Sequence, residues 1–239
     1  MKTVGFKKFG DPEVLEVMEF PDNEIGSEDI KIKNYASAVN PTDIVSRSGL
    51  IKHFIKDFSL PCVPGMDFAG IVEEAGENVK TGIKVGDSVM GMVMPNGIHG
   101  AYSDRLILNQ FAVVKIPKNT SFIEAATLPM NGLTARLSLD LLNLKKGQTI
   151  AVTGGPGAYG GYVIQLAKAD GLIVIADSNE SDFKLLKDLG ADHIIPRGKN
   201  FVKEIRRIFP KGVDGIADGA LLNEDAIGAV KDNGSFTSV

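Results

Sequence analysis

A run of glycines between a short apolar segment and an amphipathic one constrains the fold of this chain more than any other feature. The apolar segment, residues 149–153, has the length of a buried strand, and apolar residues recur at helical spacing from Tyr159 onward. In that setting glycine lets the backbone approach a pyrophosphate, and the helix start offers unpaired N–H groups. The loop predicts a dinucleotide site formed by Gly154, Gly155, Gly157, Ala158, Tyr159 and Gly160. The alternative is a glycine-rich turn that binds nothing.

The second half of the chain alternates short apolar segments with amphipathic ones. This rhythm predicts right-handed βαβ units and a parallel sheet covered on both faces, an α/β fold. The expected strands are 149–153, 172–176, 193–196, 213–217 and 235–239, with helices at 181–189, 201–209 and 223–230.

The first half carries short apolar or alternating segments broken by Gly, Pro, Asn and Asp, which predicts a compact, barrel-like β domain. Ser121 followed by Glu124 has the pattern of a capping box, and the spacing of apolar residues changes from strand-like to helical at this point. Four leucines at 133, 137, 141 and 144 then recur at helical spacing. The expected strands of the first half contain residues 30–33, 69–72, 88–93, 106–108 and 111–116.

Composition excludes several classes of protein. Hydrophobic residues make up 44% and charged residues 23% of the 239 residues, which is typical of a folded globular chain. A net charge of −4 gives no basic surface for nucleic acid or an anionic membrane, and no apolar run approaches the roughly 20 residues that span a bilayer. The N-terminus lacks the apolar core of a secretion signal, so we expect a cytoplasmic protein.

Cys62 is the only cysteine, so an intrachain disulfide is impossible, and we expect a small buried side chain.

The order of motifs along the chain resembles the medium-chain dehydrogenase/reductase superfamily. The matching segments are Asn40–Asp43, Gly65–Gly76, Gly86–Gly91, Gly100–Asp104, Ala125–Ala135 and Leu144–Gln148, followed by the strand–glycine–helix unit. The resemblance covers most of the chain. It implies an N-terminal GroES-like β domain at 1–120 and a Rossmann dinucleotide-binding domain at 121–239, with the active site in the cleft between them.

Within that superfamily the chain resembles the zinc-free, quinone oxidoreductase-like branch. Zinc enzymes of the superfamily place a metal-binding Cys near the position of Asn40 and a His-Glu pair where this chain has Met66 and Asp67. Thioether and amide groups do not replace thiolate and imidazole as zinc ligands, so no metal site is expected. The resemblance implies hydride transfer from NADH or NADPH to a quinone or an activated enone.

The same resemblance places Asn40 and Asp43 at the floor of the site and Thr134 close to the nicotinamide, which makes these three the catalytic candidates. The alternatives are a structural turn for residues 40–43 and a helix-start residue without ligand contact for Thr134. Relatives often carry a proton-donating Tyr where this chain has Ile51. Protonation would then come from water or another residue such as His53, or the acceptor is a quinone that needs no dedicated donor.

Two residues give opposite indications for the coenzyme. Asp177 ends the second strand of the predicted sheet, where an acidic side chain usually binds the adenosine ribose and repels a 2′-phosphate. Arg197 follows the third strand and could meet that phosphate, whereas Asp182 stands where NADPH-preferring relatives tend to have Lys. Both NADH and NADPH therefore stay open.

The sequence also raises a question about completeness. The doubly wound dinucleotide fold usually has six strands, and only five are predicted here. The chain therefore resembles a C-terminally shortened member, in which a sheet edge would be exposed and the usual homodimer would be in doubt.

Three functions are compatible with the sequence. The first is an NAD(P)H-dependent quinone or enone reductase acting on a small molecule. The second is a non-catalytic NAD(P)H-binding protein, either a sensor or an inactive short form. The third interprets the glycine turn as an S-adenosylmethionine loop, against which the motifs of the β domain argue.

Overall fold

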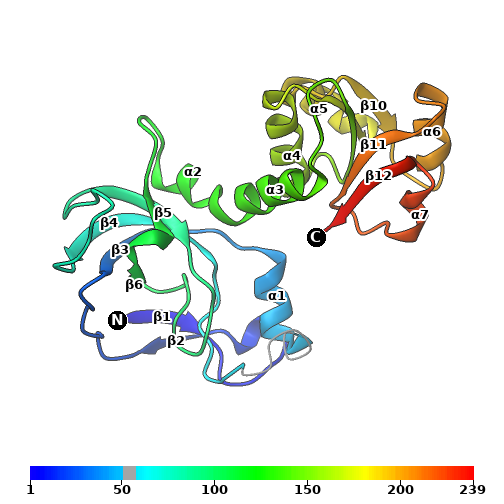
Figure 1. Cartoon of the computed structure of the whole chain (residues 1–239). Coiled ribbons are helices and arrows are strands. Elements are labelled where there is room, and N and C mark those ends of the chain that lie inside the picture. The colour runs from blue at the N-terminus through cyan, green and yellow to red at the C-terminus, as the bar shows by residue number, and fades with distance from the viewer. Residues whose placement is uncertain (51–57) are drawn as a thin grey trace. The chain divides into compact units, whose positions relative to one another are not determined.

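The computed structural model describes residues 1–50 and 58–239, and the chain forms two compact units, Met1–Met130 and Asn131–Val239 (Figure 1). The α/β class and the division into an antiparallel and a parallel sheet agree with the sequence-based expectation.

The first unit is built on an antiparallel sheet of five strands in the order β6-β3-β4-β5-β7. Buried and exposed residues alternate along β3 and β6, so Ile30 pairs with Leu108, and Ile32 with Leu106, on one core face. Phe68 and six other buried apolar residues complete this core: Val72, Ile83, Val89, Val93, Ala101 and Val113. The strands are β3 (Asp29–Ser37), β4 (Asp67–Ala75), β5 (Ser88–Met92), β6 (Arg105–Asn109) and β7 (Val113–Lys115).

Two short strands of this unit were not predicted. They are β1 (Lys2–Gly5) and β2 (Glu16–Glu19), which pair antiparallel in a sheet of their own and are too short to show a clear alternation. The strand predicted at 111–116 is partly wrong. Residues Gln110–Ala112 form a 3-10 turn that begins at Asn109, whose side chain accepts a hydrogen bond from Phe111 N at 3.2 Å.

The capping box at Ser121 is confirmed, but its helix belongs with the first unit. In α2 (Phe122–Ala126), Ser121 Oγ accepts from Glu124 N and Glu124 Oε2 accepts from Ser121 N. Ala125 and Ala126 pack against residues of β4 and β5. The structure therefore divides the chain after Met130, whereas the boundary expected from the sequence lay after residue 120.

The second unit is a parallel sheet of five strands in the order β10-β9-β8-β11-β12, as expected for a Rossmann domain. Its buried strands explain the continuous apolar segments in the sequence. Helices cover both faces, with separate buried clusters on each side. The strands are β8 (Thr149–Thr153), β9 (Ile173–Ser178), β10 (His193–Pro196), β11 (Val213–Asp218) and β12 (Val230–Ser238), and the helices are α4 (Ala158–Ala169), α5 (Phe183–Leu189), α6 (Phe201–Ile208) and α7 (Glu224–Ile227).

The predictions for this unit hold for every strand and helix, with the largest differences at its C-terminal end. α7 is shorter than the predicted 223–230, and β12 begins earlier than the predicted residue 235. The cause is a register shift in the pairing with β11, in which Val213 pairs with Val230 but Gly215 pairs with Ser235. The residues between bulge out of the ladder, with Asn233 at φ 61°.

The helix that carries the regularly spaced leucines turns most of them outward. In α3 (Pro129–Leu142), Leu133, Leu137 and Leu141 are 57%, 59% and 68% exposed. Ala135 and Leu139 face the core instead. Helical spacing thus predicted the helix correctly but could not tell which apolar face is buried.

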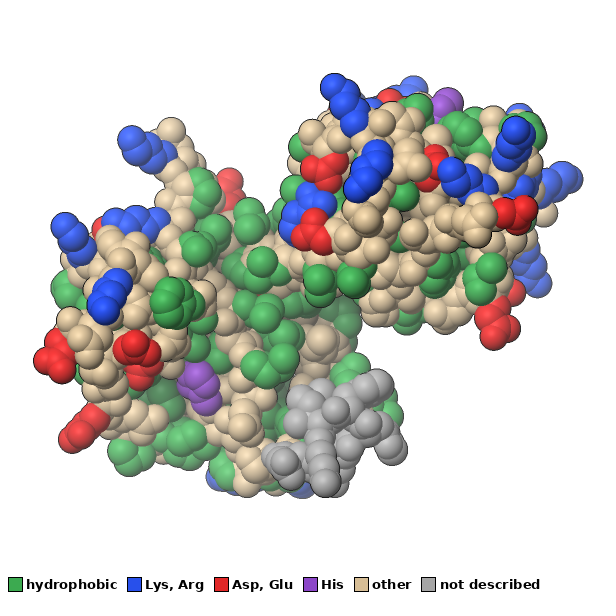
Figure 2. All heavy atoms as spheres, viewed as in Figure 1, with side chains coloured by type: hydrophobic (Ala, Val, Ile, Leu, Met, Phe, Trp, Pro, Cys, Tyr) green, Lys and Arg blue, Asp and Glu red, His purple; other side chains and the backbone are tan. Residues whose placement is uncertain are grey.

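Two further expectations concern the chain as a whole. Within residues 1–50 and 58–239 the structure has no helix that is long and apolar enough to cross a membrane. Cys62 is fully buried, and burial together with the charge of Asp43 raises the pKa of its thiol to about 12. On the face shown in Figure 2, acidic and basic side chains of the second unit are interspersed.

Candidate functional site

The glycine loop connects β8 to α4 through a tight turn. Gly154 has φ +66°, a left-handed conformation that suits glycine, and its carbonyl accepts from Gly157 N at 2.9 Å. Gly157 is the N-cap of α4. A Cβ on Gly160 would lie 2.4 Å from Gly154 O, so only glycine allows the helix to approach the loop this closely. The first N–H groups of α4 have no acceptor within the helix and follow a loop in which Pro156 is the one residue with a side chain, an arrangement that fits a pyrophosphate.

Asp177 turns its carboxylate into this loop instead of outward. It is 2% exposed, and Oδ1 accepts from Gly154 N at 2.7 Å. Burial raises the pKa of this carboxyl, although the Gly154 N–H and the Arg197 guanidinium favour its charged form. Asp177 therefore lies at the predicted position, and the contact it makes in the structure is with the loop.

Arg197 lies beside Asp177 at the same end of the sheet. Its backbone N–H donates to Ser178 O at 2.9 Å, which continues the pairing of β10 with β9. Nε lies 3.7 Å from Asp177 Oδ2, and the side chain is 43% exposed. The guanidinium is thus available to a ligand that reaches this end of β9.

Tyr159 contributes its backbone, not its ring, to the start of α4. The side chain is 9% exposed and its hydroxyl donates to Ser138 Oγ at 2.8 Å. Burial raises the pKa of this phenol. A Cβ on Gly219 would lie 2.6 Å from the ring, so glycine makes room for the ring there.

A second anchored loop, which sequence reasoning missed, lies next to the glycine loop. Thr153 Oγ1 donates to the fully buried Asp218 at the end of β11, and Thr153 Oγ1 accepts from Ala220 N at 2.9 Å. Asp218 also accepts from Leu222 N and Asn223 N, at 3.1 and 2.7 Å. The available signal was a polar residue directly after a buried strand, the same signal that identified Asp177.

The first unit holds a separate polar cluster at the start of α1 (Pro41–Ser48). Asp43 accepts from Asn40 N at 2.8 Å, from Gly65 N at 2.8 Å and from the Tyr102 hydroxyl at 3.1 Å. Burial and the Asp43 charge raise the pKa of Tyr102 above its usual range. Gly65 has φ +94°, and a Cβ there would lie 2.4 Å from the Tyr102 ring. The cluster joins three segments of the unit.

Residues 40–43 form the start of a helix. Asn40 is an N-cap, Pro41 occupies the first helical position, and Asp43 is the N3 residue of a capping box. Asn40 and Asp43 are 4% and 6% exposed. Thr134 lies on α3 in the second unit and is partly buried. Ile51 and His53 lie outside the described residues.

The residues at the expected metal positions bind one another. Asn40 Nδ2 donates to Asp67 Oδ2 at 2.6 Å, Met130 N donates to Asp67 Oδ1 at 2.6 Å, and Thr42 Oγ1 donates to Met66 Sδ at 3.3 Å. Burial raises the pKa of Asp67. The part of the chain that the structure describes contains no group of three His, Cys, Asp or Glu side chains able to hold a metal ion. This donor set does not fit zinc.

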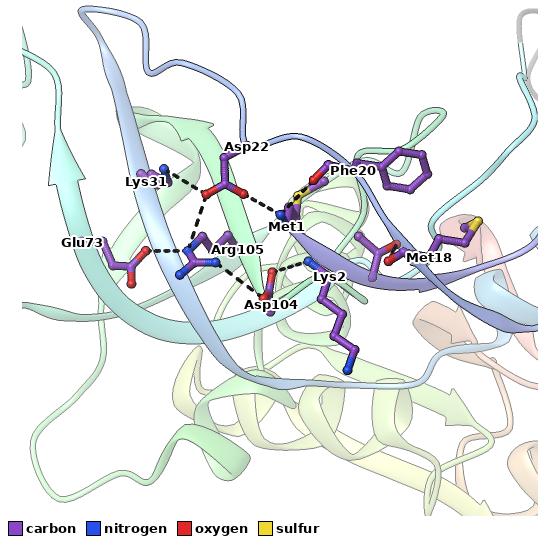
Figure 3. A network of polar contacts seen from close by, with 10 residues as sticks. Met1, Lys2, Met18, Phe20, Asp22, Lys31, Glu73, Asp104 and Arg105 are labelled. Atoms are coloured by element: carbon purple, nitrogen blue, oxygen red, sulfur yellow. Dashed lines mark hydrogen bonds and ion pairs between the residues drawn. The ribbon is translucent and has the colours of Figure 1, made fainter.

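One hollow on the first unit is unrelated to these residues. It measures about 210 Å³ and is bordered by Asp22, Lys31 and Arg105. Figure 3 shows that its charges are paired: Asp22 lies 2.6 Å from the Met1 amino group and 3.6 Å from Lys31, and Arg105 lies 3.1 Å from Glu73. Since these ions neutralise one another, we assign the hollow no ligand.

Comparison with known proteins agrees with the two units. Residues 26–118 match the family model for the alcohol dehydrogenase GroES-like domain, and residues 158–239 match the model for zinc-binding dehydrogenase. The second name refers to zinc, for which the amide of Asn40 and the thioether of Met66 are poor ligands.

Similar proteins include two reductases and a quinone oxidoreductase, all longer than this chain. The 2-methylene-furan-3-one reductase of Solanum lycopersicum is 36% identical over 98% of this chain, which spans 61% of that protein. The chloroplastic NADPH-dependent alkenal/one oxidoreductase of Arabidopsis thaliana is 30% identical over 100% of this chain, and 62% of its length is covered. The quinone oxidoreductase structure from Coxiella burnetii superposes with a TM-score of 0.84 at 31% identity, covering 100% of this chain and 75% of that chain.

Proposed function

This chain belongs to the medium-chain dehydrogenase/reductase superfamily, and on that premise we propose that it reduces a quinone or an activated enone with NADH or NADPH, without zinc. The observation that carries the proposal is the glycine loop between β8 and α4. It lies where the strand order of the sheet reverses, the position at which doubly wound folds bind a dinucleotide.

The residues of the second unit would hold the coenzyme in defined ways. The coenzyme supplies the hydride when it is bound. The backbone N–H groups at Ala158, Tyr159 and Gly160 would bind the pyrophosphate, and Gly154, Gly155 and Gly157 would leave room for it. Thr134 is our candidate for contact with the nicotinamide, as the family resemblance implies.

The roles proposed for the first unit are positional. Asn40 and Asp43 are buried and hydrogen-bonded to each other, so we assign them the task of fixing the start of α1 and the ring of Tyr102. No step of the proposed reaction passes through a metal, because the Asn40 amide and the Met66 thioether are poor ligands for zinc and the Asp67 carboxylate already accepts from Asn40 Nδ2 and Met130 N. Stabilisation of the enolate or quinol anion would then depend on positioned polar groups.

In this proposal two side chains set the preference between NADH and NADPH. Arg197 is exposed and would attract the 2′-phosphate of NADPH. Asp177 is buried against Gly154, so its discrimination against that phosphate would act through charge rather than through contact. The relative affinities of NADH and NADPH measure the balance of the two.

The test is a titration of the purified chain with NADH and with NADPH, followed by nicotinamide fluorescence, with 1,4-benzoquinone or a simple enone then added. Oxidation of the coenzyme, unchanged by a metal chelator, is expected. Binding without oxidation would reassign the chain as a non-catalytic NAD(P)H-binding protein. No binding of either coenzyme would contradict the proposal, and heat released on adding S-adenosylmethionine would replace it.

A pair of glycine variants separates the loop's function from its folding. Gly157→Val places a side chain at the N-cap of α4 and should abolish coenzyme binding. Gly161→Ala is the matched control, because its Cβ would lie 3.5 Å from Leu189, an ordinary contact, and coenzyme affinity should stay unchanged. Equal affinity in both variants would contradict the assignment of the loop.

A further inference from the structure

The loop between β11 and α7, residues 219–223, lies beside the glycine loop. β11 and β8 are neighbours in the sheet, and Asp218 pairs with Thr153, the residue before Gly154. A Cβ placed on Gly154 would lie 3.4 Å from Ala220 N. The two loops therefore border the same point at the carboxyl ends of the strands, where the strand order reverses.

This loop is fixed on both sides of Leu221. Ala220 N donates to Thr153 Oγ1, and Leu222 N and Asn223 N donate to the carboxylate of Asp218. Thr153 and Asp218 are both fully buried. A buried carboxylate with three donors holds its partners in one geometry, so the conformation of the loop is imposed by the strands beneath it.

Leu221 is held in a conformation that leucine rarely adopts. Its φ is +57°, in the left-handed region where a branched side chain is strained. The side chain is 58% exposed, so burial in the core does not explain the strain. A strained backbone that its surroundings enforce is a common property of ligand-binding positions.

The direction of a bound dinucleotide follows from the sheet. The adenosine half belongs over β9, where Asp177 and Arg197 lie, and the pyrophosphate belongs at the start of α4. The nicotinamide half must then extend to the opposite side of the glycine loop, over the end of β11. Leu221 is the large exposed apolar side chain of the loop at that end.

We propose that Leu221 is a binding residue for the nicotinamide riboside half of NADH or NADPH, held in place by Thr153 and Asp218. The inference rests on the proposed coenzyme binding. The apolar side chain gives the nicotinamide ring a surface to lie against and excludes water from that side of it.

The substitution Leu221→Gly tests this directly, because glycine removes the side chain and relieves the strain. The unfolding temperature of the chain without coenzyme should stay the same or rise, by up to roughly 3 °C. The dissociation constant for NADH or NADPH should rise roughly tenfold. The affinity for ADP, which lacks the nicotinamide riboside, should stay within about twofold of the wild-type value.

Asn223→Gly is the matched control. Asn223 has φ +50° in the same loop and its Nδ2 donates to Leu221 O at 3.1 Å, so glycine relieves strain and also releases the Leu221 backbone, while Leu221 keeps its side chain. Coenzyme affinity should be unchanged in this variant. A loss of NADH affinity equal to that of Leu221→Gly would mean that loop rigidity, not the leucine side chain, is responsible, and would overturn the inference.

The remaining outcomes separate this inference from the proposed function. If the wild-type chain binds NADH or NADPH and Leu221→Gly binds it equally well, the inference alone is wrong. If Leu221→Gly loses ADP affinity as well, the leucine does not act on the nicotinamide half. If the wild-type chain binds neither coenzyme, the proposed function fails and this inference with it.

Discussion

Both units bury aspartates at the ends of secondary structure, but the two sets bind different partners. In the first unit Asp43 joins α1 to the Gly65 backbone and to the Tyr102 hydroxyl, three segments far apart in sequence. In the second unit Asp177 and Asp218 accept mainly from the backbone of loops at the carboxyl ends of parallel strands. An antiparallel domain with irregular connections needs cross-links. A parallel sheet already aligns its loops, so its carboxylates can shape a ligand-binding edge.

The largest effect on stability is expected when the hydrogen bonds that Asp43 accepts from three segments of the first unit are removed. Asp43→Ala leaves the Asn40 N–H, the Gly65 N–H and the Tyr102 hydroxyl without their acceptor, which should lower the free energy of unfolding by about 3 kcal/mol or more. The measurement is urea unfolding followed by circular dichroism. Asp140→Ala is the control: its surface pair with Arg136 should contribute about 0.5 kcal/mol at most. Similar losses in both variants would contradict the role of Asp43.

Asp214 lies near the start of β11, whereas Asp218 lies at its end. The hydrogen bonds that Asp214 accepts should make the stability of the protein depend on pH. Burial alone would raise the pKa of Asp214, but hydrogen bonds from Lys231 and from Thr149 N and Oγ1 lower it to about 2. A group whose pKa is lowered by folding stabilises the protein above its unfolded pKa, and this stabilisation disappears as pH falls from about 4 to about 2.

Asp214→Asn should therefore cost about 2 kcal/mol at pH 7, and the difference from wild type should shrink steadily below pH 4. Unfolding in urea at a series of pH values measures it. A difference that does not change with pH would show that packing, not charge, accounts for the effect.

Variants of Asp177 and Arg197 separate two proposed roles at the carboxyl end of β9: anchoring the glycine loop and attracting the 2′-phosphate of NADPH. Asp177→Ala should weaken NADH roughly five- to tenfold, about 1 kcal/mol, because the loop loses its anchor, and should weaken NADPH less, because the charge that repels the 2′-phosphate is removed as well. Arg197→Ala should weaken NADPH alone, and Lys199→Ala, an exposed cation two residues away, should change neither. A selective gain in NADPH binding by Asp177→Ala would instead show direct discrimination by the carboxylate.

The smallest effects should come from two hydrogen-bonded tyrosine hydroxyls, one in each unit. Tyr102→Phe removes one of three donors to Asp43, and Tyr159→Phe removes the hydrogen bond to Ser138. Each should lower the free energy of unfolding by about 1 kcal/mol. The double variant Tyr159→Phe/Ser138→Ala should be no less stable than Tyr159→Phe, because both partners are then apolar. A further loss in the double variant would count against this account of the pair.

The candidate site could be predicted in part because strand ends are visible in a sequence. Asp177 follows a buried apolar segment and the glycine loop precedes an amphipathic helix, so their positions were predictable. Thr153 and Asp218 stand at equivalent strand ends, but nothing local shows that β11 lies next to β8. The Tyr102 contact with Asp43 spans 59 residues and depends on the folding of the whole first unit.

The sequence by itself determined the α/β class, the alternation of strands and helices in the second half, the capping box at Ser121 and the glycine loop. These depend on periodicity and on local backbone chemistry, which act within a few residues. Only the tertiary structure decided which face of α3 is buried, that α2 belongs with the first unit, that Asn40 and Asp43 cap a helix in a closed network, and that Asp177 points into the glycine loop. Those outcomes depend on burial and on hydrogen bonds between distant segments, because a buried polar group takes whichever partner the completed fold brings to it.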